Sequence, residues 1–214
     1  ERKHFGVIYE RLLNSLQSAG NAGEFYTPRA ITKFISYMLD PKPNEKILDP
    51  ACGTGGMITC CIDTMRENHI KTAEDEKKMQ NNLIGFEKKP FPFILCVTNM
   101  LLKNILSPNF IKYDNTLTRP YISWTKEERV DVVVSNPPFA GKEEPGVESN
   151  FPNQFRTRET ADLFLSLIIR LLKKNGRAGV IMPDGTMFGD NKVKTFLKKH
   201  LLEETNLHTI IKLH

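Results

Sequence analysis

The chain has 214 residues, of which 40% are hydrophobic, and its formal net charge is +5 at pH 7. This length and composition exclude a disordered chain and predict a globular protein with a substantial core. No apolar run reaches the length of a transmembrane helix and no signal peptide is visible, so we expect a cytoplasmic protein without a membrane partner. The positive charge agrees with a nucleic-acid partner but does not establish one.

Hydrophobic periodicity and turn residues predict that helices and strands alternate along the chain. In chain order, the expected elements are helices over 5–19, 28–38, 57–68, 93–102, 162–174 and 193–202, and strands over 46–49, 83–87, 110–114, 130–135, 178–182 and 208–213. This alternation favours an α/β fold with a mostly parallel sheet and helices on both faces. The chain lacks an initiator Met and stops near the last expected strand, so we expect a fragment with an incomplete sheet.

Three details of this pattern carry specific expectations. Thr27 is expected to cap the second helix, with Pro28 at its first position. Residues 71–80 are highly charged without an apolar stripe, which indicates an exposed helix or an insertion. Residues 140–160 form a long polar loop, which is either functional or disordered. The loop contains three basic side chains, Lys142, Arg156 and Arg158. They either contact DNA phosphates or lie on a disordered surface.

The cysteines do not indicate a metal site. The four residues are Cys52, Cys60, Cys61 and Cys96. Their spacing fits neither a zinc site nor a disulfide framework. We therefore expect reduced, buried thiols and no bound metal.

The first strand leads through a glycine-rich loop at 49–56 into a helix, which is the arrangement of a nucleotide-binding unit. The loop has neither the P-loop pattern nor the dinucleotide pattern GxGxxG. Asp49 at the end of the strand would repel a pyrophosphate but attract an α-amino group, which favours S-adenosylmethionine over NAD. Glu87, at the end of the second strand, is placed to accept hydrogen bonds from ribose hydroxyls.

The motif Asn136-Pro137-Pro138-Phe139 follows a buried strand, where α/β sheets present their ligands. The Asn136 amide oxygen and the Pro137 carbonyl can accept the two N–H bonds of an exocyclic amine, as on adenine. Phe139 offers a surface on which a base can stack. These groups suit a site in which a methyl group is transferred to that amine nitrogen, and no cysteine stands beside the motif to act as a nucleophile.

These motifs together resemble the amino-methyltransferases of DNA, and most closely the methylation subunit of type I restriction–modification systems. The motifs are, in chain order, GEFYTPR at 23–29, ILDPACGTGG at 47–56, GFEKKP at 85–90 and VVVSNPPF at 132–139. The resemblance implies a Rossmann-like, S-adenosylmethionine-dependent methyltransferase that acts on N6 of a flipped adenine in double-stranded DNA. It also implies a specificity subunit and a restriction subunit as partners. In this interpretation 1–22 is the remnant of a helical region, and 23–214 is a catalytic domain incomplete at its C-terminal end.

The resemblance also implies roles for individual residues. The segment that would line the cofactor comprises Glu24, Phe25, Tyr26, Thr27, Pro28 and Arg29. The loop residues that would hold the methionine moiety are Asp49, Pro50, Gly53, Thr54 and Gly55. Glu87 would bind the ribose, and either Asp114 or Asn115 would lie near the adenine of the cofactor. The catalytic motif that would hold the target base is Asn136, Pro137, Pro138 and Phe139.

Other functions share parts of this pattern. Similar Pro-Pro-aromatic motifs occur in enzymes that methylate N4 of cytosine, RNA bases or protein glutamine. The GEFYTPR segment favours DNA, and cytosine N4 enzymes more usually have Ser-Pro-Pro. A cofactor-binding scaffold without turnover is a further alternative, which the intact Asn136 and Asp49 argue against.

Overall fold

The computed structural model describes residues 27–139 and 141–213 of the chain. The helix predicted over 5–19 and the boundary predicted after residue 22 lie outside these residues. So do three of the predicted cofactor contacts, Glu24, Phe25 and Tyr26.

Five parallel strands form one sheet. They are β1 (Ile47–Asp49), β2 (Leu83–Glu87), β3 (Ile111–Tyr113), β4 (Val130–Ser135) and β5 (Leu172–Val180). Their order is β3-β2-β1-β4-β5, and every neighbouring pair is parallel. The predicted α/β class with a parallel sheet is therefore confirmed.

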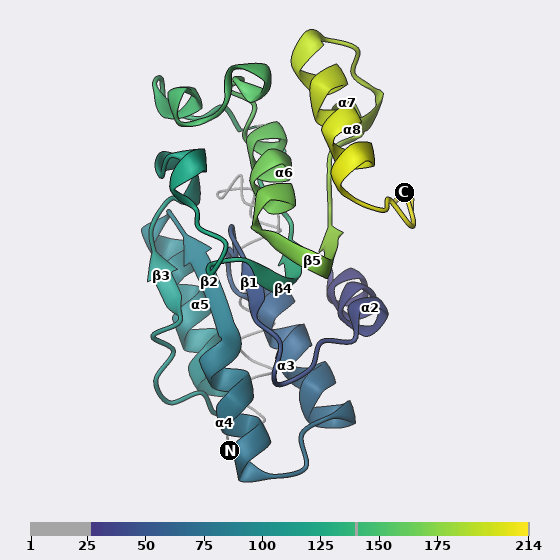
Figure 1. Cartoon of the computed structure of the whole chain (residues 1–214). Coiled ribbons are helices and arrows are strands. Elements are labelled where there is room, and N and C mark those ends of the chain that lie inside the picture. Colours follow the sequence, from purple (N-terminus) through teal and green to yellow (C-terminus); the bar gives the residue numbers. More distant parts are fainter. Residues whose placement is uncertain (1–26, 140, 214) are drawn as a thin grey trace.

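Helices cover both faces of this sheet (Figure 1). The helices are α2 (Arg29–Leu39), α3 (Gly56–Asn68), α4 (Ala73–Asn82), α5 (Pro90–Leu102), α6 (Thr160–Leu171), α7 (Asp184–Phe188) and α8 (Lys192–Glu204), with short 3₁₀ turns at Thr116–Thr118, Tyr121–Ser123, Val147–Asn150 and Asn153–Phe155. Along β4, Val132 and Val134 join the core beneath α3 and α5, whereas Val133 joins the core beneath α6. This alternation is what a strand with two buried faces requires.

Some elements differ from the sequence predictions, whereas the charged segment at 71–80 forms a helix, as one of its two predicted alternatives. Helix α2 starts at Arg29 with Pro28 as its N-cap residue, so the predicted cap by Thr27 is wrong. Helix α6 ends at Leu171, and β5 starts directly afterwards, earlier than expected. The charged segment at 71–80 largely forms α4, which begins with reciprocal hydrogen bonds between Thr72 and Asp75. The strand predicted over 208–213 is absent from the described residues, because 206–213 pair with no other strand.

The polar segment 141–159, which we call the strap, has a defined conformation. Lys142 pairs with Glu159 in an antiparallel bridge, so the two ends of the strap lie together. The guanidiniums of Arg156 and Arg158 donate to backbone carbonyls within the strap. At its far end, Phe151 and other aromatic side chains are buried around the ring of Tyr121. The alternative of a disordered loop is therefore wrong, and contact with DNA phosphates stays a prediction.

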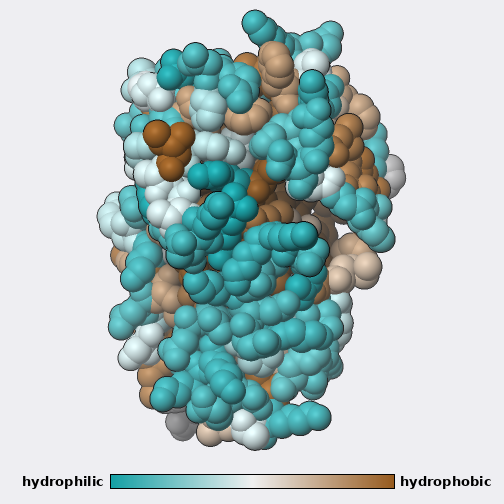
Figure 2. All heavy atoms as spheres, in the orientation of Figure 1, coloured by the Kyte–Doolittle hydropathy of each residue, from teal (hydrophilic) through white to brown (hydrophobic). Residues whose placement is uncertain are grey.

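The surface is mainly hydrophilic on the face shown in Figure 2, with small hydrophobic groups near the top of that view. Isolated hydrophobic side chains of this kind are normal on protein surfaces. Within 27–139 and 141–213, no helix combines the length and the apolar character needed to cross a membrane.

Candidate functional site

The strand order brings the predicted motifs to one edge of the sheet. Strand β1 lies between β2 and β4, so the carboxyl ends of these three strands are neighbours. Asp49 ends β1, Glu87 ends β2, and Asn136 directly follows β4. From β1 the chain adds β2 and β3 on one side of the sheet, and it then adds β4 and β5 on the other side. Ligands of open α/β sheets bind at the point where the strand order switches in this way.

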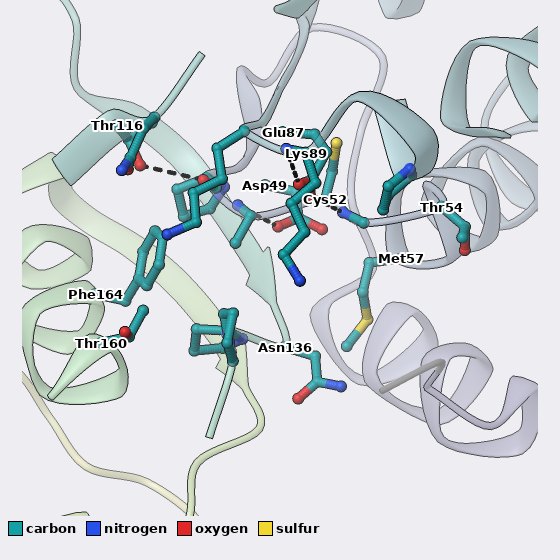
Figure 3. A pocket seen from close by; sticks show the side chains of 18 of the residues that line it. Asp49, Cys52, Thr54, Met57, Glu87, Lys89, Thr116, Asn136, Thr160 and Phe164 are labelled. Atoms are coloured by element: carbon teal, nitrogen blue, oxygen red, sulfur yellow. Dashed lines mark hydrogen bonds between the residues drawn. The ribbon is translucent and has the colours of Figure 1, made fainter. Parts of the chain in front are cut away.

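A cavity of about 150 Å³ lies at this edge (Figure 3). The predicted site residues that line it are Thr27, Asp49, Pro50, Gly53, Thr54, Glu87, Asp114, Asn115, Asn136, Pro137 and Pro138. The structure therefore places the glycine-rich loop and the Asn-Pro-Pro motif around a common space, although more than 80 residues separate them in the sequence.

Four predicted residues within the described part do not line the cavity. Pro28 is the N-cap residue of α2, and Arg29 forms an ion pair of 3.1 Å with Asp63. Gly55 is the N-cap residue of α3, has φ 82° and lies close to the Cys96 side chain. Phe139 is half-buried at the end of the motif, outside the lining of the cavity.

Asp49 is a buried acid at the centre of the site. Its side chain is 1% exposed, and its Oδ1 accepts hydrogen bonds of 3.1 Å from the Ala51 amide and from the Ser135 hydroxyl. Burial raises the pKa of the Asp49 carboxyl to about 7, and the neighbouring Glu87 carboxylate contributes in the same direction. Asp49 can therefore gain or lose a proton near neutral pH, and a positively charged ligand would favour its ionised form.

Glu87 connects the glycine-rich loop to the end of β2. Its Oε2 accepts from the Gly53 amide at 2.9 Å, and its Oε1 accepts from the Lys89 amide at 2.7 Å. The Glu87 carboxylate therefore joins the loop to the residue that follows β2 by two hydrogen bonds. The sequence predicted only a ligand contact, whereas the structure adds the role of fixing the loop.

Asn136 is held in one orientation. Its Nδ2 donates to the Thr27 hydroxyl at 2.8 Å, across 109 positions of sequence. Its Oδ1 is buried and has no hydrogen-bond partner among the described residues. A buried acceptor without a partner is costly and rare in native proteins, and such groups mark functional positions. Asn136 thus lines the cavity with its Nδ2 fixed and its amide oxygen left as an unused acceptor.

Residues that the sequence did not assign to the site also line the cavity. Among them are Lys88, Glu143, Thr160 and Phe164. In Figure 3, Thr160 and Phe164 lie on the opposite side of the cavity from Thr54 and Met57. Phe164 lies on α6 and is also packed in the core beneath that helix. Nothing in the local sequence distinguishes Glu143 from the acid beside it, because its burial depends on segments far along the chain.

Cys52 also lines the cavity, although it lies far from the Asn-Pro-Pro motif in sequence. Its Sγ lies 3.8 Å from Sγ of Cys96. The hydrogen bond with Cys96 and burial raise the pKa of the Cys52 thiol well above its usual value. A neutral thiol is a poor nucleophile, so the site does not offer a thiolate for attack on a base.

Comparisons with known proteins agree with this geometry. The family model described as N-6 DNA Methylase matches residues 1–214. The methylase subunit of the type I restriction enzyme EcoEI from Escherichia coli is 58% identical over 100% of this chain and 43% of that protein. The methylase subunit of EcoKI from Escherichia coli K12 is 30% identical, over 99% of this chain and 41% of that protein.

A solved structure shows the same fold. A modification subunit of a type I restriction enzyme from Vibrio vulnificus YJ016 aligns with a TM-score of 0.82 at 36% identity, over 94% of this chain and 44% of that one. This chain thus spans less than half the length of these relatives. The resemblance seen in the sequence motifs is confirmed, and because the family model matches the whole chain, the chain belongs to the N-6 DNA methylase family.

Proposed function

We propose that this chain forms the S-adenosylmethionine-binding and catalytic part of a methyltransferase that acts on N6 of adenine in DNA. The observation that carries the proposal is the orientation of Asn136. Its Nδ2 is fixed by Thr27 and its buried Oδ1 has no partner among the described residues, at a position that lines the cavity together with the glycine-rich loop. An amide acceptor in this position suits an exocyclic amine.

The residues around the cavity fit this cofactor. The Asp49 carboxylate attracts its α-ammonium group, and Glu87 accepts hydrogen bonds from its ribose. A Cβ added at Gly53 or Gly56 would meet no atom within 4 Å, so the loop backbone borders open space. Gly53 has φ 55°, a left-handed conformation that glycine adopts readily.

Asp114, which follows β3, is a better candidate than Asn115 for a contact with the adenine of the cofactor. Asn115 uses both ends of its amide, because Oδ1 accepts from the Leu117 amide and Nδ2 donates to Glu143. Within the described residues, the Asp114 carboxylate accepts one hydrogen bond, which the neighbouring Asn115 amide donates to Oδ1 at 2.8 Å. Asp114 therefore retains capacity for the adenine amine.

The chain contributes to methyl transfer by orienting the target amine. When bound, S-adenosylmethionine supplies an electrophilic methyl group on its sulfonium. Asn136 Oδ1 and the Pro137 carbonyl accept the two N–H bonds of the adenine amine, which directs the nitrogen lone pair toward that methyl group. The prolines fix the direction of the carbonyl, and orientation of this kind supplies a large part of catalytic rate.

The target base has to leave the duplex to reach this site. Flipping a base costs about a few kcal/mol, and stacking on an aromatic side chain recovers about 1–3 kcal/mol. Phe139 lies outside the cavity lining, so we expect it to stack on the base at the mouth of the cavity. Asn136 and Phe139 thus act on the same base from two sides.

The partners follow from the relatives. A solved structure titled for complex assembly of the type I restriction–modification system aligns with a TM-score of 0.81 at 34% identity. We propose that the intact protein carrying this chain works with a specificity subunit and a restriction subunit on double-stranded DNA. The net charge of +5 is consistent with a DNA partner.

The variant Asn136→Ala tests the proposal in the intact protein with its partners. We expect methyl transfer to fall by at least about 100-fold, as when a fixed dipole is removed from an active site, with little change in cofactor affinity. Asn206→Ala, an exposed asparagine outside the site, is the matched control. The assay offers adenine-containing DNA, cytosine-only DNA, RNA and protein acceptors, which separates the alternative substrates. Normal methylation by Asn136→Ala, or cofactor binding without transfer by the unmodified protein, would contradict the mechanism.

A further inference from the structure

Glu143 is a buried acid in the strap, seven residues after Asn136. Its side chain is 1% exposed and lines the cavity. A buried carboxylate is costly unless it is paired and hydrogen-bonded, so its partners indicate what it does.

The Glu143 carboxylate connects three elements. Its two oxygens accept from Lys88 Nζ at 2.8 and 3.0 Å. Its Oε2 also accepts from Asn115 Nδ2 at 3.2 Å, and its Oε1 accepts from the Thr160 hydroxyl at 3.2 Å. Lys88 follows β2, Asn115 follows β3, and Thr160 begins α6. The acid therefore fixes the side chains that follow two neighbouring strands.

The backbone of Glu143 is fixed as well. Its amide donates to the Arg158 carbonyl at 2.9 Å, and its own carbonyl accepts from the Arg158 guanidinium at 2.8 and 3.0 Å. The Thr160 amide donates to the Gly141 carbonyl at 3.0 Å. The carboxylate therefore cannot move without opening the strap that continues from the Asn-Pro-Pro motif.

Lys88 and Asn115 line the cavity on the side of β2 and β3, next to Glu87 and Asp114. Under the proposed function, this is the side where the ribose and the adenine of the cofactor bind. A lysine can present its aliphatic stem to a flat ring while its ammonium is held elsewhere. The hydrogen bonds that Lys88 Nζ donates to Glu143 hold the Lys88 ammonium in this way.

We propose that Glu143 is a positioning residue for the adenosine part of the cofactor, because it holds Lys88 and Asn115 together as one wall of that subsite. This inference rests on the proposed function. It predicts that loss of the Glu143 charge releases the Lys88 side chain. The affinity of any ligand that contains the adenosine part should then fall. The amino-acid part of the ligand should contribute as before, since Asp49 lies at the end of a different strand.

The test compares two ligands by calorimetry on the intact protein. S-adenosylhomocysteine carries the amino-acid part, whereas 5′-methylthioadenosine lacks it. Because hydrogen bonds to a charged group are lost, Glu143→Gln should raise Kd by about tenfold for both ligands, and by the same factor. Glu144→Gln, an exposed acid beside it, is the matched control and should leave both affinities unchanged. Asp49→Asn should weaken S-adenosylhomocysteine alone.

A double variant separates positioning from folding. If Glu143 acts through Lys88, the losses should not add: Glu143→Gln combined with Lys88→Met should weaken both ligands about as much as Glu143→Gln alone, because the ammonium that Glu143 holds is then absent. Thermal unfolding confirms that each variant is folded. Unchanged affinities in Glu143→Gln, a loss confined to S-adenosylhomocysteine, or fully additive losses in the double variant would overturn the inference. If the unmodified protein binds neither ligand, the proposed function itself fails.

Discussion

The substitution Asp49→Asn removes the negative charge at the centre of the cavity and keeps the shape of the side chain. The Asn Oδ1 can still accept from the Ala51 amide and the Ser135 hydroxyl, as Asp49 Oδ1 does at 3.1 Å. The glycine-rich loop should therefore keep its position. The change isolates the proposed interaction between the carboxylate and the α-ammonium group of the cofactor.

The structure makes this interaction depend on pH. Burial raises the pKa of Asp49 to about 7, so the acid is mostly neutral at pH 6 and mostly ionised at pH 7.5. An ammonium ligand prefers the ionised form, so its affinity should rise with pH through about 7 and fall below it. A hydrogen bond to a charged group contributes about 1.5–3 kcal/mol, which corresponds to a factor of about 10–150 in Kd.

The expected result is a pH-dependent effect of the substitution. At pH 7.5 about three quarters of Asp49 is ionised, so Asp49→Asn should weaken S-adenosylhomocysteine by most of this factor. At pH 6 only about a tenth is ionised, so the ratio between the Kd values of the substituted and the unmodified protein should be about fourfold to eightfold smaller. The cofactor's own amino group titrates equally in both experiments, so its contribution cancels in this ratio.

Calorimetry in two buffers with different ionisation enthalpies measures both the affinity and the protons released. The unmodified protein should release about 0.4–0.9 of a proton from Asp49 on binding at pH 6, and Asp49→Asn should release none from this site. Asp190→Asn makes the same substitution at an exposed carboxylate, so this variant should behave like the unmodified protein. Equal weakening at both pH values, or unchanged proton release, would refute the reasoning that Asp49 titrates against the ammonium.

Two further predictions concern stability and are checked by urea unfolding. Lys194→Met removes the ammonium that lies 2.7 Å from the buried Asp162 carboxylate, and it should cost about 3–5 kcal/mol because the acid is left unpaired; adding Asp162→Asn should restore much of this. If the double variant is no more stable than Lys194→Met, the unpaired charge is not the cause. Gly55→Ala forces a side chain onto a residue with φ 82° and places Cβ 2.7 Å from Cys96 Sγ, so it should cost at least about 1–2 kcal/mol. Gly56→Ala, whose added Cβ meets no atom within 4 Å, is the control, and equal losses in the two variants would contradict this explanation.

Much of the fold could be predicted because hydrophobic periodicity is a local property. The helices over 57–68 and 93–102 and the strands over 83–87 and 130–135 were predicted at or within a few residues of their observed bounds. Where a boundary depends on pairing, local pattern was insufficient. The apolar residues of 208–213 suggested a strand, but a strand requires a hydrogen-bonded neighbour, and Ile210 and Ile211 are instead exposed.

The sequence by itself placed Asp49, Glu87 and Asn136 at the ends of strands, and parallel strands carry their ligand-binding ends to the same edge of a sheet. That was sufficient to predict the cofactor loop and the Asn-Pro-Pro motif as one site. Only the tertiary structure decided that Thr27 orients the Asn136 amide, that Asp49 titrates near neutral pH, and that Glu143 enters the cavity. These properties arise from burial and from contacts between residues far apart in the sequence, which no local pattern of residues specifies.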